Sequence, residues 1–121
     1  MPFAVALGVE VTAASAAEVR GRLAWAPERC TTGGVLHGAA IMGLADTLGA
    51  ICAFLNLPPG AGTATIESKT NFFAAVRSGS VEGVTQPLHV GRRTIVVQTD
   101  VRDPSGRRVA LVTQTQAVLA E

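Results

Sequence analysis

The longest apolar stretch of the chain lies in its middle third and predicts one long helix. Residues 38–57 read GAAIMGLADTLGAICAFLNL and are followed by Pro58 and Pro59, so we expect a helix from about His37 to Asn56. On a helical wheel, one side of this helix carries a continuous apolar stripe of Ile41, Leu44, Leu48, Ile51 and Leu55. Such a stripe is expected to pack against a β-sheet.

Alternating apolar and polar positions on both sides of this helix predict β-strands. Two short strands are expected before it, over Val5–Val11 and Val19–Trp25. Four strands in hairpin succession are expected after it: Thr63–Phe73, Ser78–His89, Thr94–Arg102 and Val109–Leu119. Pro87 indicates a bulge or a sheet edge within the second of these four.

This order of elements predicts a single α+β domain over residues 1–121. One helix that is apolar on most of its surface needs cover on both sides, and the pattern predicts no second helix. A second copy of the chain is therefore expected to supply the cover, which predicts a dimer at minimum. A charged fraction of only 16% also favours a surface that another subunit covers.

Composition argues against several other classes of protein. A net charge of +1, one tryptophan and no tyrosine give no surface suited to nucleic acid. Cys30 and Cys52 form no disulfide framework, which favours a reducing cytoplasm. No His/Cys cluster has metal-ligand spacing, so neither a metal nor a cofactor is expected. The first residues, MPFAVALGVEV, do not predict a signal peptide. The central helix approaches membrane-spanning length, but Asp46 and its small neighbours argue against a span.

Asp46 is the only formally charged residue between Arg29 and Glu67, and it lies opposite the apolar stripe of a helix expected to be mostly buried. A buried carboxylate is unfavourable unless something pairs with it or uses it. Its neighbours on the wheel are mostly small and leave room for a ligand or for the approach of another backbone: Ala39, Met42, Gly43, Gly49, Ala50 and Ala53. We therefore expect Asp46 to be catalytic, with Ala39, Met42 and Ala50 binding substrate. The alternatives are a structural acid and, for Met42, a core side chain.

His37 and Gly38 stand at the predicted start of the helix, where backbone N–H groups are free and the helix dipole is positive. Because Gly38 has no side chain, a carbonyl oxygen can approach its amide and be polarised there. Gly38 and Asp46 are roughly 12 Å apart along one helix, too far to act on one carbon atom. Antiparallel helices of two subunits would bring the two groups together, which predicts a shared site.

Several segments resemble the hotdog-fold acyl-CoA thioesterases, and in particular their PaaI-type branch. They are GVLHGA at 34–39, LADT at 44–47, ATIESKTNFF at 64–73, HVGRR at 89–93 and VRDPSGRRVA at 101–110. The resemblance implies the hotdog fold, in which a curled antiparallel β-sheet wraps one long central helix. It also implies dimers that pair into tetramers, and hydrolysis of acyl- or aryl-CoA to a carboxylic acid and free CoA.

The resemblance implies a role for individual residues as well. Gly38 polarises the thioester carbonyl, and His37 supports the turn before it. Asp46 from the other subunit acts as general base on water, or as a nucleophile through a transient anhydride. Thr65 corresponds to a hydroxyl that helps to hold the attacking water, and Thr31 stands where the family often has Asn or Gln. An ordinary strand threonine at Thr65 and a loop anchor at His37 are the structural alternatives.

Three further positions bear on the substrate. Ala39 stands where the family usually has glycine, and its methyl group is expected to narrow the acyl pocket. Arg92 and Arg93 are suited to binding CoA phosphates, with plain solvated charge as the alternative.

The alternation of the strand predicted over Thr63–Phe73 places four polar residues on one face: Thr65, Glu67, Lys69 and Asn71.

Two other functions remain open on the same fold. A hydratase typically uses an Asp-His pair a few residues apart on the helix, or a histidine with an acid from the partner subunit. No histidine follows Asp46 before the helix ends, and His89 is far along the chain. A non-catalytic acyl-CoA-binding or sensor protein would bind the thioester tightly and release no thiol. Thiol release therefore distinguishes an enzyme from a sensor.

Overall fold

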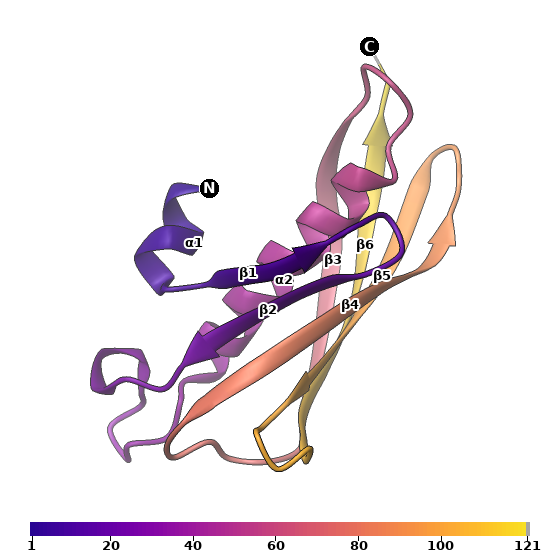
Figure 1. Cartoon of the computed structure of the whole chain (residues 1–121). Coiled ribbons are helices and arrows are strands. Elements are labelled where there is room, and N and C mark those ends of the chain that lie inside the picture. Colours follow the sequence, from indigo (N-terminus) through magenta and orange to yellow (C-terminus); the bar gives the residue numbers. More distant parts are fainter. Residues whose placement is uncertain (121) are drawn as a thin grey trace.

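One antiparallel sheet of six strands curls around a long helix (Figure 1). The structure is a computed structural model and describes residues 1–120. Its elements are α1 (Pro2–Leu7), β1 (Glu10–Ala14), β2 (Val19–Ala24), the short 3-10 helix η1 (Pro27–Arg29), α2 (Gly38–Leu55), β3 (Gly62–Phe72), β4 (Ser80–Val90), β5 (Thr94–Arg102) and β6 (Arg108–Leu119). The predicted α+β architecture is confirmed.

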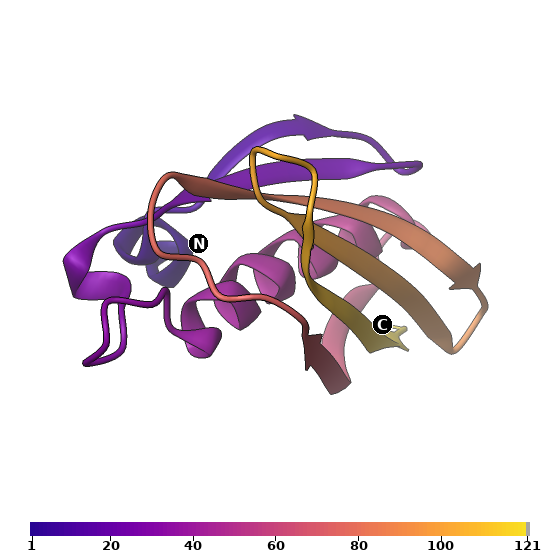
Figure 2. The same ribbon diagram turned by 90° about the horizontal axis from the view of Figure 1, so that it is seen from below.

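The strands follow the order β1-β2-β4-β5-β6-β3, and every neighbouring pair is antiparallel. β1 and β3 are therefore the two edges of the sheet. Helix α2 packs across the concave face and contacts all six strands (Figure 2). The buried core lies between α2 and this face, and its apolar members include Leu23, Leu44, Leu48, Ile95, Val97 and Val101.

Helix α2 begins and ends where the sequence predicts, with His37 as its N-cap and Asn56 as its C-cap. Of the predicted apolar stripe, Ile41, Leu44 and Leu48 are buried, whereas Leu55 is 40% exposed. Two strand glycines allow the close approach of the helix. A Cβ atom at Gly21 or Gly83 would lie 2.7 or 2.8 Å from a Leu48 methyl group.

The N-terminal segment differs from the prediction. Residues Pro2–Leu7 form helix α1, and β1 begins only at Glu10, so the expected strand over Val5–Val11 is wrong. Proline suits the first helical turn, and Gly8 ends the helix at φ 96° with its N–H bonded to the Ala4 carbonyl. Leu7 of α1 packs onto α2, which corrects the expectation of a single helix.

Bulges explain two features of the later strands. The register of β4 against β5 shifts between Pro87 and His89, so the predicted bulge at Pro87 is present. In β3 the register against β6 shifts between Thr65 and Glu67. Thr65 therefore faces the helix side with its partner Gln116, while Glu67 faces the other side with Thr115. The prediction of one shared face for Thr65, Glu67, Lys69 and Asn71 is wrong at this point.

Within residues 1–120, α2 is the one helix with the length and hydropathy of a membrane span. Half of this segment is buried in the fold, which is typical of a core helix. Cys30 and Cys52 are both free thiols, and burial raises the pKa of Cys52.

Candidate active site

Asp46 lies on a flank of α2 within hydrogen-bond distance of Gln114 in β6, and it is nevertheless exposed in a single chain. The prediction of a buried carboxylate is therefore wrong for one chain alone. The reason is that the sheet covers the apolar stripe and one flank of the helix, including Ala45, Gly49 and Cys52, but stops short of Asp46. Any desolvation of this carboxylate must come from a ligand or another molecule.

Two glutamines of β6 connect Asp46 with Thr65. Gln114 Nε2 donates to Asp46 Oδ1 at 2.6 Å and lies 3.5 Å from Thr65 Oγ1. Gln116 Nε2 donates to the same threonine oxygen at 2.8 Å, and Gln116 Oε1 accepts from Thr63 Oγ1 at 3.1 Å. The structure thus brings two of the predicted residues, Asp46 and Thr65, into one polar network.

The helix start presents a free amide at Gly38. His37 Nδ1 accepts the Ala39 N–H at 2.9 Å, and the His37 carbonyl accepts from Ala40 and Ile41. The Gly38 N–H has no intrahelical partner by its position and forms no other hydrogen bond within residues 1–120. His37 therefore anchors the loop to the helix, as its structural alternative proposes, and leaves the Gly38 donor available.

Phe72 covers Gly38 from the side. A Cβ atom at Gly38 would lie 3.0 Å from Phe72 Cζ, so the ring of this β3 residue lies against the glycine. Phe72 is 49% exposed, and its neighbour Phe73 is 59% exposed. Sequence reasoning did not select Phe72. The pair of aromatic residues at the end of an edge strand was the available signal.

Thr31 lies in the loop between η1 and α2, which hydrogen bonds close into a compact hairpin. Thr31 N–H donates to the Val35 carbonyl at 2.8 Å, and His37 N–H donates to the Arg29 carbonyl at 2.9 Å. The Thr31 side chain is exposed, and its hydroxyl forms no hydrogen bond within the described part of the chain. The structure does not connect Thr31 with Asp46 or Thr65.

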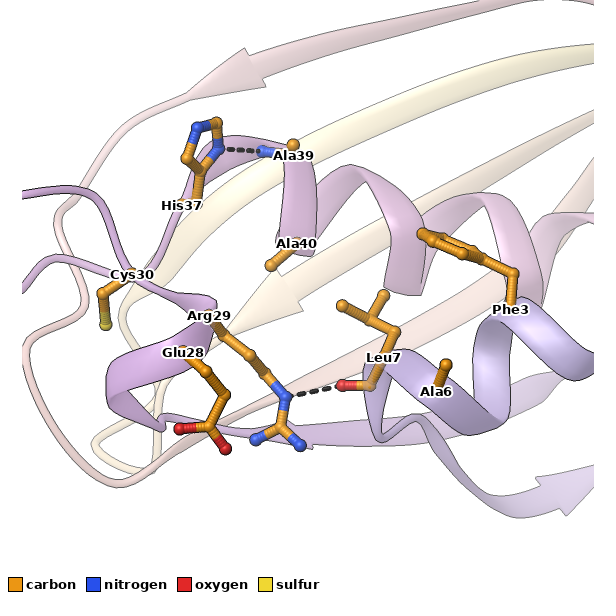
Figure 3. Close-up of a pocket in the computed structure, with 9 residues that line it drawn as sticks. All are labelled: Phe3, Ala6, Leu7, Glu28, Arg29, Cys30, His37, Ala39 and Ala40. Atoms are coloured by element: carbon orange, nitrogen blue, oxygen red, sulfur yellow. Dashed lines mark hydrogen bonds between the residues drawn. The ribbon is translucent and has the colours of Figure 1, made fainter.

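A cavity of about 400 Å³ adjoins the start of α2 (Figure 3). Helix α1, the η1 segment and α2 contribute its lining: Phe3, Ala6, Leu7, Glu28, Arg29, Cys30, His37, Ala39 and Ala40. Arg29 Nε donates to the Leu7 carbonyl and holds the end of α1 in place (Figure 3). Ala39 thus lines this cavity, and its role in binding substrate stays a prediction.

The other predicted binding residues lie elsewhere. Ala50 lines a separate apolar hollow of about 330 Å³ together with Met1, Ile51, Phe54 and Thr63. Met42 is 42% exposed, so the alternative of a core side chain is wrong. Arg92 and Arg93 are exposed in the β4–β5 turn and form no ion pair within residues 1–120. No group of three or more His, Cys, Asp or Glu side chains that could hold a metal occurs in those residues either.

The fold and the site together define the class: a hotdog-fold protein with an acid on its central helix. PaaI, the phenylacetic acid degradation protein of Thermus thermophilus, has the same fold. The solved structure of a point mutant of PaaI superposes with a TM-score of 0.87 at 25% identity, covering 97% of this chain and 98% of that one.

Family comparison is consistent with this fold. The model of the thioesterase superfamily matches residues 33–110. The proofreading thioesterase EntH of Cronobacter sakazakii is 36% identical over 86 residues, and the 1,4-dihydroxy-2-naphthoyl-CoA hydrolase of Escherichia coli is 34% identical over 86 residues. Each match covers 71% of this chain and 63% of the relative, so the chain spans less than two thirds of these relatives' length. The chain belongs to the thioesterase superfamily.

Proposed function

We propose that this protein hydrolyses acyl- or aryl-CoA thioesters to the carboxylic acid and free CoA. The observation that carries the proposal is the exposed Asp46 carboxylate, one oxygen of which accepts a hydrogen bond from Gln114. The same amide nitrogen of Gln114 lies 3.5 Å from the Thr65 hydroxyl oxygen. The free Gly38 amide at the start of the same helix supplies a second functional group. Membership of the thioesterase superfamily supports the reaction class, as do the names of the two relatives.

A complete site in this proposal needs two copies of the chain. Gly38 and Asp46 are eight residues apart on α2, or roughly 12 Å along its axis. Antiparallel α2 helices related by a two-fold axis place Gly38 of one copy opposite Asp46 of the other. Met42, four residues from each, then lies near the axis and meets its own copy.

Apolar surface along α2 and the β3 edge supports a second copy as the occupant of this face. Met42 is 42%, Phe54 64%, Ile66 61% and Phe72 49% exposed. Isolated apolar side chains are common on surfaces, but a set that follows one helix and one free strand edge suits an interface. The pairing of such dimers into tetramers, and a cytoplasmic location, belong to the same proposal.

The proposed step uses Asp46 as a general base. The carboxylate takes a proton from water as the water oxygen attacks the thioester carbon, and the Gly38 N–H holds the developing oxyanion. The carbon–sulfur bond then breaks, and the proton on Asp46 passes to the leaving sulfur. Thr65 Oγ1 can orient the attacking water. Direct attack by Asp46 through an anhydride uses the same geometry, and neither route requires a metal or another cofactor.

The substrate's CoA part and acyl part are assigned to different regions. The exposed guanidinium groups of Arg92 and Arg93 are proposed to meet CoA phosphates. The acyl group is proposed to lie against α2, where Ala39, Met42 and Ala50 are within reach of the face that carries Asp46. The Ala39 methyl group narrows the wall next to Gly38.

The test is the Asp46→Asn variant, assayed by thiol release from acetyl-, hexanoyl- and benzoyl-CoA. We expect kcat to fall by about 10²- to 10⁴-fold with the oligomer intact, because an amide cannot accept the proton. Asp100→Asn, in an exposed ion-pair cluster of the outer sheet face, is the matched control and should retain the parental rate. Parental turnover by Asp46→Asn would refute the mechanism. Tight binding by the parent protein without thiol release would instead identify an acyl-CoA-binding protein.

A further inference from the structure

Gln114 occupies a position where an apolar residue would be expected. It lies on the helix-facing side of β6 and is 1% exposed, as is Val112 two residues earlier. A buried amide group is unfavourable unless its donors and acceptor are all paired. Its carbonyl oxygen, Oε1, has no hydrogen-bond partner within residues 1–120. Packing alone therefore does not explain a glutamine here.

The hydrogen bond to Asp46 fixes the orientation of this amide. A carboxylate oxygen only accepts, so the amide nitrogen must be the atom that lies 2.6 Å from Asp46 Oδ1. The carbonyl oxygen then points towards α2 and lies against Gly49. The neighbouring Gln116 differs, because its nitrogen and its oxygen are paired with Thr65 and Thr63. Gln114 instead bonds to the Asp46 carboxylate through its nitrogen, and its carbonyl oxygen has no hydrogen-bond partner within residues 1–120.

Gly49 is the reason that the amide can reach Asp46. A Cβ atom at this position would lie 1.9 Å from Gln114 Oε1 and 3.0 Å from its Cδ. Any side chain on residue 49 would therefore push the amide away from the helix. Gly49 lies three residues after Asp46, so the open position and the carboxylate are one turn apart on the same helix.

We propose that Gln114 is a positioning residue for Asp46, and that Gly49 provides the space it requires. The inference rests on the proposed function, since it assumes that Asp46 is catalytic. The Gln114 bond holds Oδ1, and no residue within 1–120 forms a hydrogen bond to Oδ2. An exposed carboxylate on a helix would otherwise sample several rotamers, most of which point its oxygens away from the reacting water.

The first test is Gln114→Met, which keeps the length and shape of the side chain and removes the donor. Thiol release from hexanoyl- and benzoyl-CoA should show kcat lowered by about 10- to 100-fold, with KM within about twofold, because a misdirected base affects the transition state and not substrate binding. Thr99→Val is the matched control. It removes the buried 2.6 Å hydrogen bond between Thr99 and Thr85 in the same sheet and should leave kcat unchanged.

The second test keeps the inference falsifiable if Gln114→Met folds poorly. Gly49→Ala should lower kcat in the parent, because its methyl group displaces the amide. The same substitution should change kcat by less than about twofold in a Gln114→Ala background, where no amide remains to be displaced. A purely structural role predicts independent losses in the two backgrounds, and that result would overturn the inference.

The outcomes separate this inference from the proposed function. If Asp46→Asn abolishes turnover and Gln114→Met keeps the parental kcat, the positioning role is refuted and the mechanism stands. If Asp46→Asn keeps parental turnover, the mechanism itself is refuted, and the positioning role with it. If both variants lose kcat while the Thr99→Val control does not, both are supported.

Discussion

Two aspartates on opposite faces of the molecule are held in contrasting ways. Asp100 lies on the outer face of the sheet, where Arg102 Nε and Arg108 Nε each lie 2.9 Å from one of its oxygens. Partial burial raises the pKa of Asp100, but the hydrogen bonds from Arg108 and Arg102 outweigh it and hold that pKa below its ordinary value. Asp46, on the helix face, bonds to a single neutral amide and to no cation within residues 1–120.

The contrast extends to the surroundings of each acid. The outer face around Asp100 also carries the ion pairs of Arg20 with Glu18 and Glu82, so this chain neutralises its own charges there. The face around Asp46 carries exposed apolar side chains such as Met42 and Phe54. A carboxylate paired with two guanidinium groups loses its charge, and with it both ion pairs, when it takes up a proton. Asp46 has no ion pair within residues 1–120, which suits a group proposed to accept a proton during a reaction.

Among variants of the helix face that keep Asp46, a large effect is expected from removing one N–H group. Gly38→Pro deletes the N–H proposed to bind the oxyanion. The variant should still fold, because proline is favoured in the first helical turn and the extended backbone of His37 (φ −64°, ψ 136°) is compatible with a following proline. We expect kcat to fall by about 10²- to 10³-fold in the thiol-release assay. Gly38→Ala retains the N–H and adds the same Cβ next to Phe72, so it measures the steric share of the loss.

Mixed oligomers then show whether the two groups belong to different subunits. A heterodimer of one Gly38→Pro chain and one Asp46→Asn chain contains one complete site if the site is shared. It should recover about half the activity of the parent dimer, although each variant is inactive alone. No recovery in a purified, differentially tagged heterodimer would show that Gly38 and Asp46 of one chain serve the same site.

A charge placed near the proposed two-fold axis tests the dimer on which the shared site depends. Met42→Glu brings two like charges together in the dimer and should produce monomers in sedimentation analysis, with activity lost as the shared sites separate. Leu88→Glu changes a similarly exposed apolar residue (57%) that borders the charged outer face, and it should leave the dimer and its rate intact. An active, dimeric Met42→Glu variant would contradict the proposed axis.

The sequence predicted the parts of the fold that depend on local patterns. Helix α2 is recognisable from its apolar stripe and from Pro58, and the hairpin strands from alternation and from turns such as the one at Asp103. Helix α1 was mistaken for a strand because a short apolar run has no decisive periodicity. The register shift between Thr65 and Glu67 in β3 depends on pairing with β6, which no local pattern encodes.

The site was predictable in its parts but not in its connections. Asp46, Gly38 and His37 stand out by charge and by position at one helix. Gln114 contacts Asp46 across 68 residues of sequence, and only the fold of β6 against α2 brings them together. The available signal was the pair Gln114 and Gln116 on one face of a strand whose other residues on that face are apolar. The exposure of Asp46 also depends on how far the sheet curls, which the helical wheel does not show.

The smallest predicted effect concerns the arginines that contrast with those of the outer face. Arg102 and Arg108 are paired within the chain, whereas Arg92 and Arg93 form no ion pair within residues 1–120 and are free to meet phosphates. The double variant Arg92→Ala/Arg93→Ala should raise KM for hexanoyl-CoA about fivefold with kcat unchanged, because exposed charge pairs contribute about 1 kcal/mol. Arg77→Ala, which removes another exposed arginine, is the control. Hexanoyl-pantetheine lacks the phosphates, so the KM of the double variant for this thioester should equal that of the parent. An equal rise in KM for both thioesters would contradict a phosphate contact.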